Sequence, residues 1–142
     1  TTKEMVASVV SIHLKSKKKL LMSQGNYNND IGLPLSLLNI EKTQKCAVVE
    51  MGMNHKGEIS YLSKIARPDV AVITNIAEAH IEFFASKKGI AKAKSEIFEG
   101  LKKSGIAIIN RDDEFYTLMK NGEWIIVLII VTILTSQLKN PY

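Results

Sequence analysis

The sequence has little of several residue types on which whole classes of protein depend. Of its 142 residues only one is cysteine and one tryptophan, with four phenylalanines and four tyrosines. The single cysteine, Cys46, permits no disulfide framework and no cysteine-rich zinc site within one chain, and it fits a reducing compartment. The few aromatic residues are not interleaved with basic ones, as a surface that stacks nucleic-acid bases requires.

The chain also lacks a hydrophobic run long enough to cross a membrane. Its prominent run covers residues 124–134, whereas a membrane-spanning helix needs about 20 apolar residues. The β-branched content of this run favours a buried strand, with a membrane-associated tail or a non-native extension as alternatives. We find no internal repeat, no low-complexity linker and nothing at the amino terminus that resembles a signal peptide.

What remains is the composition of an ordinary globular domain. Hydrophobic residues make up 46% and charged residues 23% of the chain, and its length allows one domain with a real core. The formal net charge is +5, but the lysines are scattered apart from a cluster at residues 15–19. Nucleotide phosphates are therefore a better anionic partner than nucleic acid. Because the chain starts at Thr1, directly in a predicted helix, we expect a piece of a longer protein.

Hydrophobic periodicity predicts helices that alternate with short apolar strands. Thr1 and Glu4 have the spacing of a capping box at the start of a helix over residues 2–15. Its predicted apolar face consists of Met5, Val6, Val9, Val10 and Leu14. The other predicted helices cover residues 31–40, 57–66, 86–102 and 113–120, and the predicted strands cover residues 19–22, 46–49, 70–76 and 106–110. This alternation is typical of an α/β fold, a parallel sheet with helices on both faces.

Two potential metal ligands follow two of these strands. Glu50 comes directly after the strand at residues 46–49, and His80 comes after the strand at residues 70–76. Ligands of an open α/β sheet bind beyond the carboxyl ends of the strands, so both side chains are expected at one crevice. A carboxylate and an imidazole suit Mg²⁺ or Mn²⁺ bound to nucleotide phosphate. The alternatives are that Glu50 caps a helix or pairs with a lysine, and that backbone groups satisfy His80.

Lys94 lies where a charged residue is costly. In the predicted helix at residues 86–102, helical spacing places Lys94 near the centre of an apolar stripe, whereas Lys92 and Glu99 project the other way. The stripe consists of Ile90, Ala93, Ile97, Phe98 and Leu101. Because burial of an unpaired ammonium is unfavourable, Lys94 must extend its head to water, pair with a carboxylate or be chemically altered.

Five short segments, in order and with natural spacing, resemble the Mur ligases. They are residues 25–35, 50–59, 65–69, 74–80 and 91–98. Within that family they are most similar to the enzymes that join D-alanyl-D-alanine to UDP-N-acetylmuramoyl-tripeptide. The resemblance implies that residues 1–120 are an incomplete central ATP-binding domain with a P-loop NTPase-like fold, followed by a divergent hydrophobic tail at residues 121–142.

The resemblance implies an ATP-dependent amide ligase of peptidoglycan precursor synthesis. In that family ATP phosphorylates the terminal carboxylate of the tripeptide, and the amine of D-alanyl-D-alanine attacks the acyl phosphate. By motif position, Glu50 would bind the Mg²⁺ that bridges the ATP phosphates, while His80 and Lys94 would serve catalysis by binding a second Mg²⁺. Lys94 matches a lysine that is carbamylated in these enzymes, a change that turns the ammonium into an anionic oxygen ligand.

The resemblance also implies contacts with the substrates. Thr1 and Asn75 would contact ATP. The residues expected to meet the peptide part of the precursor are Asn26, Asn28, Asn29, Asn54 and His55. Side-chain amides donate and accept hydrogen bonds, which suits peptide groups, although an asparagine-rich loop is also typical of a plain turn. Nucleotide-linked substrates imply a cytoplasmic protein, with neither nucleic acid nor a membrane as its partner.

Two features depart from the family pattern. The glycine-rich phosphate loop ending in Gly-Lys-Thr would precede Thr1, and without it we expect this chain alone to be inactive. Phe83 and Ala85 stand where the family usually has glycines after the metal-binding histidine, which predicts a stiffer loop. The alternative interpretations are another amino-acid ligase of the superfamily, a non-catalytic remnant or binding module of the same fold, and a membrane-tethered protein.

Overall fold

The computed structural model describes residues 1–77, 83–120 and 125–129, the last of these as backbone. Helices and strands alternate along the chain as predicted. The strands are β1 (Leu20–Met22), β2 (Cys46–Val48), β3 (Val70–Ile73), β4 (Ile106–Asn110) and β5 (Ile125–Ile129). The helices are α1 (Thr2–His13), α2 (Gly32–Leu38), α3 (Glu58–Ala66), α4 (Lys87–Ser95) and α5 (Tyr116–Met119), with 3₁₀ turns η1 (Lys17–Lys19) and η3 (Glu96–Gly100).

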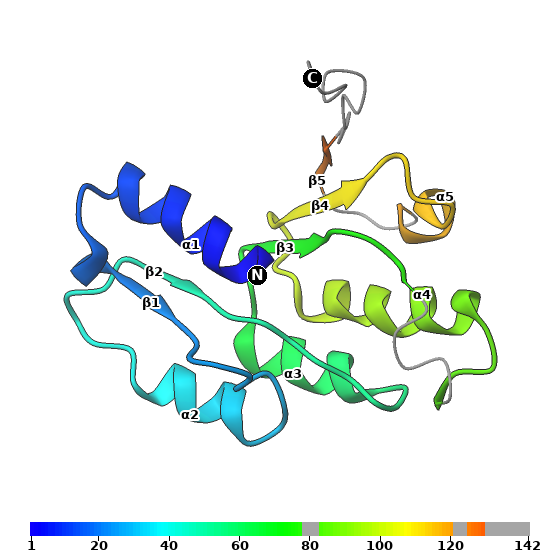
Figure 1. Ribbon diagram of the computed structural model, residues 1–142, viewed down its shortest axis with the longest axis horizontal. Helices are drawn as coiled ribbons and strands as arrows, with labels where there is room; N and C mark the ends of the chain where they lie inside the picture. Colours follow the sequence, from blue (N-terminus) through cyan, green and yellow to red (C-terminus); the bar gives the residue numbers. More distant parts are fainter. Residues whose placement is uncertain (78–82, 121–124, 130–142) are drawn as a thin grey trace, which may run out of the picture.

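Every strand pairing in the described residues is parallel, and the strands form two sheets. β1 pairs with β2, and β4 lies between β3 and β5 in the second sheet. α1 lies on one side of β1 and β2, and α2 and α3 lie on the other (Figure 1). The predicted parallel α/β architecture is therefore confirmed, as is a strand within the hydrophobic run after residue 124. None of the described helices has the length and apolar content needed to cross a membrane.

The predicted apolar face of α1 is wrong in part: Val6, Val10 and Leu14 are half-buried, but the most buried side of the helix is a different one. α1 buries Lys3, Ala7 and Ser11, whereas Met5 and Val9 are 65% and 68% exposed. α1 packs against β1 and β2, and small side chains at the contact allow the helix and the strands to approach closely. The hydrophobic pattern therefore pointed away from the most buried side of the helix, and a lysine lies on that side.

The predicted ends of two helices are confirmed. The Thr1 hydroxyl accepts a hydrogen bond from the Glu4 amide at 3.3 Å, as the capping-box spacing indicated. α3 ends where Arg67 adopts a left-handed conformation with φ +46°, directly before Pro68. The residue before a proline is disfavoured in the helical region, which explains why the helix ends there.

The predicted helix at residues 86–102 consists of α4 followed by the 3₁₀ turn η3. Lys94 is half-buried on the inner side of α4, whereas Lys92 and Glu99 are exposed, so the helical phase predicted for Lys94 is confirmed. The inner side of α4 and η3 packs on β3 and β4 to form the main core. Its buried members from these four elements are Ala71, Ile73, Ile90, Ala91, Ala93, Phe98, Ala107 and Ile109.

Candidate functional site

A cleft of about 600 Å³ lies between the loop after β1 and the loop after β2. The carboxyl ends of parallel strands are where α/β folds bind ligands, so the cleft has the expected location. Its lining includes four of the five residues for which the family resemblance implied peptide binding, namely Asn26, Asn28, Asn29 and Asn54. Residues from two distant segments are thus brought to one polar surface.

The two loops are held together by a close backbone contact. The Gly52 amide donates a hydrogen bond to the Asn28 carbonyl at 2.8 Å. A Cβ atom at Gly52 would lie only 2.9 Å from Asn28 Cγ, closer than real Cβ contacts come. Glycine at this position therefore allows the second loop to approach the asparagine loop.

The asparagines of the cleft are not equivalent. The Asn29 side-chain oxygen accepts a hydrogen bond from the Gly32 amide at 2.8 Å and so caps the start of α2. This is the turn role that an asparagine-rich loop typically has. In the described part of the chain, the side-chain amides of Asn26, Asn28 and Asn54 make no hydrogen bond. These three amides are available to a ligand, and the substrate role of Asn29 stays a prediction.

Glu58 organises the other wall of the cleft. Its carboxylate accepts hydrogen bonds from the Asn54 amide at 2.7 Å and the His55 amide at 3.1 Å. These bonds, that from Asn54 most strongly, hold the pKa of Glu58 below its ordinary value. The His55 ring lies 3.1 Å from Glu58 Oε1 through Nδ1 and also contacts the Phe83 ring, with centroids 5.6 Å apart. His55 is therefore held beside the cleft by protein groups.

Lys94 points toward the end of β3. Its ammonium donates a hydrogen bond to the Asn75 carbonyl at 3.0 Å. Burial lowers the pKa of Lys94 below its ordinary value, and the negative charge of Asp113 partly offsets this effect. Lys94 forms no ion pair with the described residues. A half-buried amine with a lowered pKa is suited to chemical modification, because its neutral form is more populated than that of an exposed lysine.

Asp113 belongs to this region and was missed by the sequence analysis. Its carboxylate accepts hydrogen bonds from the Ile76 amide at 2.7 Å and the Phe115 amide at 2.9 Å. It thereby connects the segment after β3 to the segment after β4. The signal was present, because Asp113 follows the carboxyl end of β4 just as Glu50 follows that of β2.

Glu50 lies beyond β2 with its side chain 45% exposed. One carboxylate oxygen, Oε2, is 3.6 Å from the Lys3 ammonium. The alternative prediction, that Glu50 pairs with a lysine, is therefore confirmed. No group of three or more histidine, cysteine or acidic side chains gathers into a metal site among the described residues. A single accessible carboxylate nevertheless fits Mg²⁺, which takes few protein ligands and is otherwise bound by phosphate and water.

The remaining predicted site residues keep their status as predictions. His80 lies outside the described residues. The Thr1 hydroxyl caps α1, and the Asn75 side-chain oxygen accepts a hydrogen bond from the Thr74 hydroxyl at 3.3 Å. These contacts are local, so the roles of Thr1 and Asn75 toward ATP stay predictions.

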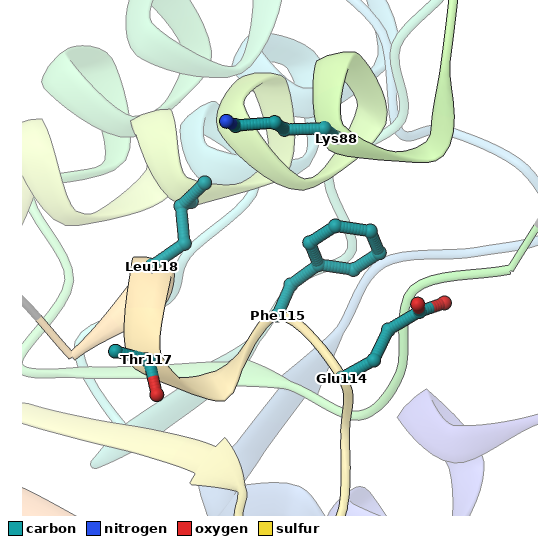
Figure 2. A pocket seen from close by; sticks show the side chains of 5 residues that line it. All are labelled: Lys88, Glu114, Phe115, Thr117 and Leu118. Carbon is teal, nitrogen blue, oxygen red and sulfur yellow. The ribbon is translucent and has the colours of Figure 1, made fainter.

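A second hollow, of about 500 Å³, lies between α4 and α5. Figure 2 shows the Phe115 ring directed toward α4, with Leu118 beside it and Lys88 and Glu114 at the margins. None of the residues assigned to substrates or metal lines it. The predicted substrate residues Asn26, Asn28 and Asn54 line the first cleft instead.

Comparison with known proteins places this geometry in a family. The Mur ligase middle domain family matches residues 1–131. The UDP-N-acetylmuramoyl-tripeptide–D-alanyl-D-alanine ligase of Haemophilus influenzae is 46% identical over 112 residues, which are 79% of this chain and 24% of that protein. A crystal structure of MurF from Acinetobacter baumannii has a TM-score of 0.83 and 40% identity, covering 93% of this chain and 28% of that one.

A third relative adds a bound nucleotide. MurF ligase from Thermotoga maritima, solved in complex with ADP, has a TM-score of 0.76 and 34% identity, covering 90% of this chain and 30% of that one. The chain thus spans about a quarter of the length of the curated relatives it matches. The match over residues 1–131 covers most of the chain, which therefore belongs to the Mur ligase middle domain family.

Proposed function

We propose that this chain is the middle-domain part of an ATP-dependent ligase that joins D-alanyl-D-alanine to UDP-N-acetylmuramoyl-tripeptide. The observation that carries the proposal is the cleft, in which uncommitted amides of Asn26, Asn28 and Asn54 lie beside the carboxyl end of β2. The relatives with this name support the choice of substrates. The relative in complex with ADP supports the choice of nucleotide. A reaction on nucleotide-linked substrates is cytoplasmic.

The reaction proceeds in two steps. The terminal carboxylate oxygen of the tripeptide attacks the γ-phosphorus of ATP, which releases ADP and forms an acyl phosphate. The amine of D-alanyl-D-alanine then attacks the acyl carbon, which forms the amide, expels phosphate and loses one proton to solvent. Phosphoryl transfer of this kind depends on positioning and on charge neutralisation, both of which the protein supplies through fixed side chains.

The chain's own residues would supply the peptide contacts and two anionic oxygen ligands, one from Glu50 and one from carbamylated Lys94. The amides of Asn28 and Asn54 would bind peptide groups of the precursor, and Glu50 would offer a carboxylate oxygen to Mg²⁺. Carbamylation would make Lys94 a second oxygen ligand: the neutral amine attacks CO₂, a nitrogen–carbon bond forms, and one proton is released to water. With His80 it would hold a second Mg²⁺, and these ions supply positive charge that neutralises the phosphates.

A chimera tests the proposed function. Residues of this chain replace the matched segment of the Haemophilus influenzae ligase, which supplies the rest of the protein. We expect phosphate release that requires ATP, the UDP-tripeptide and D-alanyl-D-alanine together. Activity with a single amino acid in place of the dipeptide would favour another ligase of the superfamily. A folded chimera without any ligase activity would favour a non-catalytic remnant.

Substitution of Asn28 tests the peptide role of the cleft. Asn28→Ala in the chimera is expected to raise the KM for the UDP-tripeptide about three- to tenfold, because one or two neutral hydrogen bonds are lost. The KM for ATP should stay unchanged. Asn39→Ala is the matched control, since Asn39 is an exposed asparagine at the end of α2. Equal KM values in both variants would remove Asn28 from peptide binding.

A further inference from the structure

Lys3 is a buried lysine in an unfavourable place. It lies in the first turn of α1 and is only 8% exposed. Lysine is almost never fully buried unless it is paired, and a positive charge near the amino terminus of a helix is opposed by the helix dipole. Both costs must be offset by the contacts of the ammonium. Family resemblance assigned no role to this residue.

The contacts of Lys3 link two parts of the candidate site. Its ammonium donates a hydrogen bond to the Gly25 carbonyl at 2.6 Å and lies 3.6 Å from Glu50 Oε2. Gly25 begins the loop that carries Asn26 and Asn28, and its φ of +47° favours glycine. Glu50 is the carboxylate offered to Mg²⁺. One ammonium therefore touches the start of the peptide-binding loop and the metal-binding residue.

We propose that Lys3 is a positioning residue that fixes the asparagine loop at Gly25 and shares the Glu50 carboxylate with Mg²⁺. This inference rests on the proposed function. The ion pair uses Oε2, and no described residue bonds to Oε1, so one carboxylate oxygen stays available to a metal. Without metal, Lys3 balances the charge of Glu50. With metal bound, Lys3 and Mg²⁺ repel each other across the same carboxylate.

The repulsion between Lys3 and Mg²⁺ allows an experiment to distinguish the proposed positioning role of Lys3 from a merely structural one. Lys3→Met keeps the buried aliphatic stem but removes the charge and the donor. The loop loses its anchor, so the KM of the chimera for the UDP-tripeptide should rise about tenfold, as expected for one charged hydrogen bond. Mg²⁺ loses a competing cation, so the Mg²⁺ concentration for half-maximal rate should fall. A variant that is only loosened would need more Mg²⁺, because Glu50 would be less well placed.

Direct Mg²⁺ binding gives a readout independent of activity. The 142-residue chain is titrated with MgCl₂ while the backbone amide of Glu50 is followed by NMR. Lys3→Met should bind Mg²⁺ about threefold to tenfold more tightly than the unaltered chain, in line with removal of one nearby charge. Lys3→Arg, which keeps the charge, should match the unaltered chain in Mg²⁺ affinity. Lys18→Met is the control for loss of an exposed lysine.

The outcomes are distinct. Unchanged or weaker Mg²⁺ binding by Lys3→Met, or an unchanged KM for the tripeptide, would overturn the inference. If the unaltered chimera is inactive, the proposed function fails, yet the Mg²⁺ titration of the chain still tests Lys3.

If Lys3→Met does not fold, the Lys3 ammonium of the unaltered chain is observed by NMR. A slowly exchanging signal that shifts with Mg²⁺ supports the role, and fast exchange as for an exposed lysine refutes it.

Discussion

Lys94→Ala in the chimera is expected to lower ligase turnover about a hundredfold to a thousandfold, the range found when one group that stabilises transition-state charge is removed. The reason is the position of the amine. It lies half-buried beside the Asn75 carbonyl at the end of β3, and burial lowers its pKa. Because the pKa of Lys94 is lowered, its neutral form is more populated than that of an exposed lysine, and reaction of that form with CO₂ would convert a half-buried cation into an oxygen ligand.

Rescue distinguishes this role from a loss of stability. Short carboxylic acids such as acetate or propionate can occupy the space left by the side chain and restore an anionic oxygen, so they should recover part of the turnover of Lys94→Ala. Lys92→Ala is the matched control, because Lys92 lies on the same helix with its side chain exposed. Turnover unaffected by Lys94→Ala would remove Lys94 from the mechanism.

The modification can also be observed without turnover. The 142-residue chain is placed in ¹³C-labelled bicarbonate with Mg²⁺, and the carbamate carbon is sought by NMR. We expect one carbamate signal that persists in Lys92→Ala and disappears in Lys94→Ala. A signal that survives in Lys94→Ala would assign the carbamate to another lysine.

The sequence predicted those features that depend on local periodicity. The alternation of helices and strands, the end of α3 before Pro68 and the inward phase of Lys94 all follow from spacing within one segment. The position of Glu50 beyond β2 also follows, because it needs only the boundary of one strand. Asp113 could have been found by the same rule, since it follows β4.

The contacts that join distant segments could not be predicted from one sequence. The orientation of α1 is an example: its hydrophobic pattern favours the side with Met5 and Val9, but close packing against β1 and β2 selects the side with Ala7 and Ser11. Lys3 is buried on that side because it finds the Gly25 carbonyl 22 residues away. Periodicity gives the faces of a helix but not the partner of each face.

Glu96 is the clearest case of a long-range contact. α3 begins after Gly57, which has no side chain to cap the helix. Instead the Glu96 carboxylate, 8% exposed, accepts hydrogen bonds from the Gly57 amide at 2.8 and 3.0 Å and from the Ser60 amide at 3.3 Å. Glu96 thus caps the amino terminus of α3 from 39 residues away in the sequence. Its negative charge also interacts favourably with the amino terminus of the helix.

Glu96→Ala is expected to lower the free energy of unfolding of the 142-residue chain by about 3 kcal/mol, because it leaves partly buried amide groups without an acceptor. Glu96→Gln should cost less, since the amide oxygen still accepts a hydrogen bond but the charge is lost. Glu99→Ala is the matched control: the Glu99 side chain is 49% exposed, and its ion pair with Lys64 is worth less than about 1 kcal/mol. Urea denaturation followed by circular dichroism measures all three variants.

The same substitution should reach the cleft, because α3 carries the turn at Asn54 and His55 on its amino terminus. A glutamine at position 96 lacks the charge and holds Gly57 less strongly, so the turn then depends more on Glu58 and on the contact of His55 with Phe83. We therefore expect Glu96→Gln, the milder variant, to raise the KM of the chimera for the UDP-tripeptide at a temperature where the protein stays folded. If Glu96→Ala loses as little stability as Glu99→Ala, water replaces the carboxylate at the start of α3, and other contacts hold η3 against the turn beside the cleft.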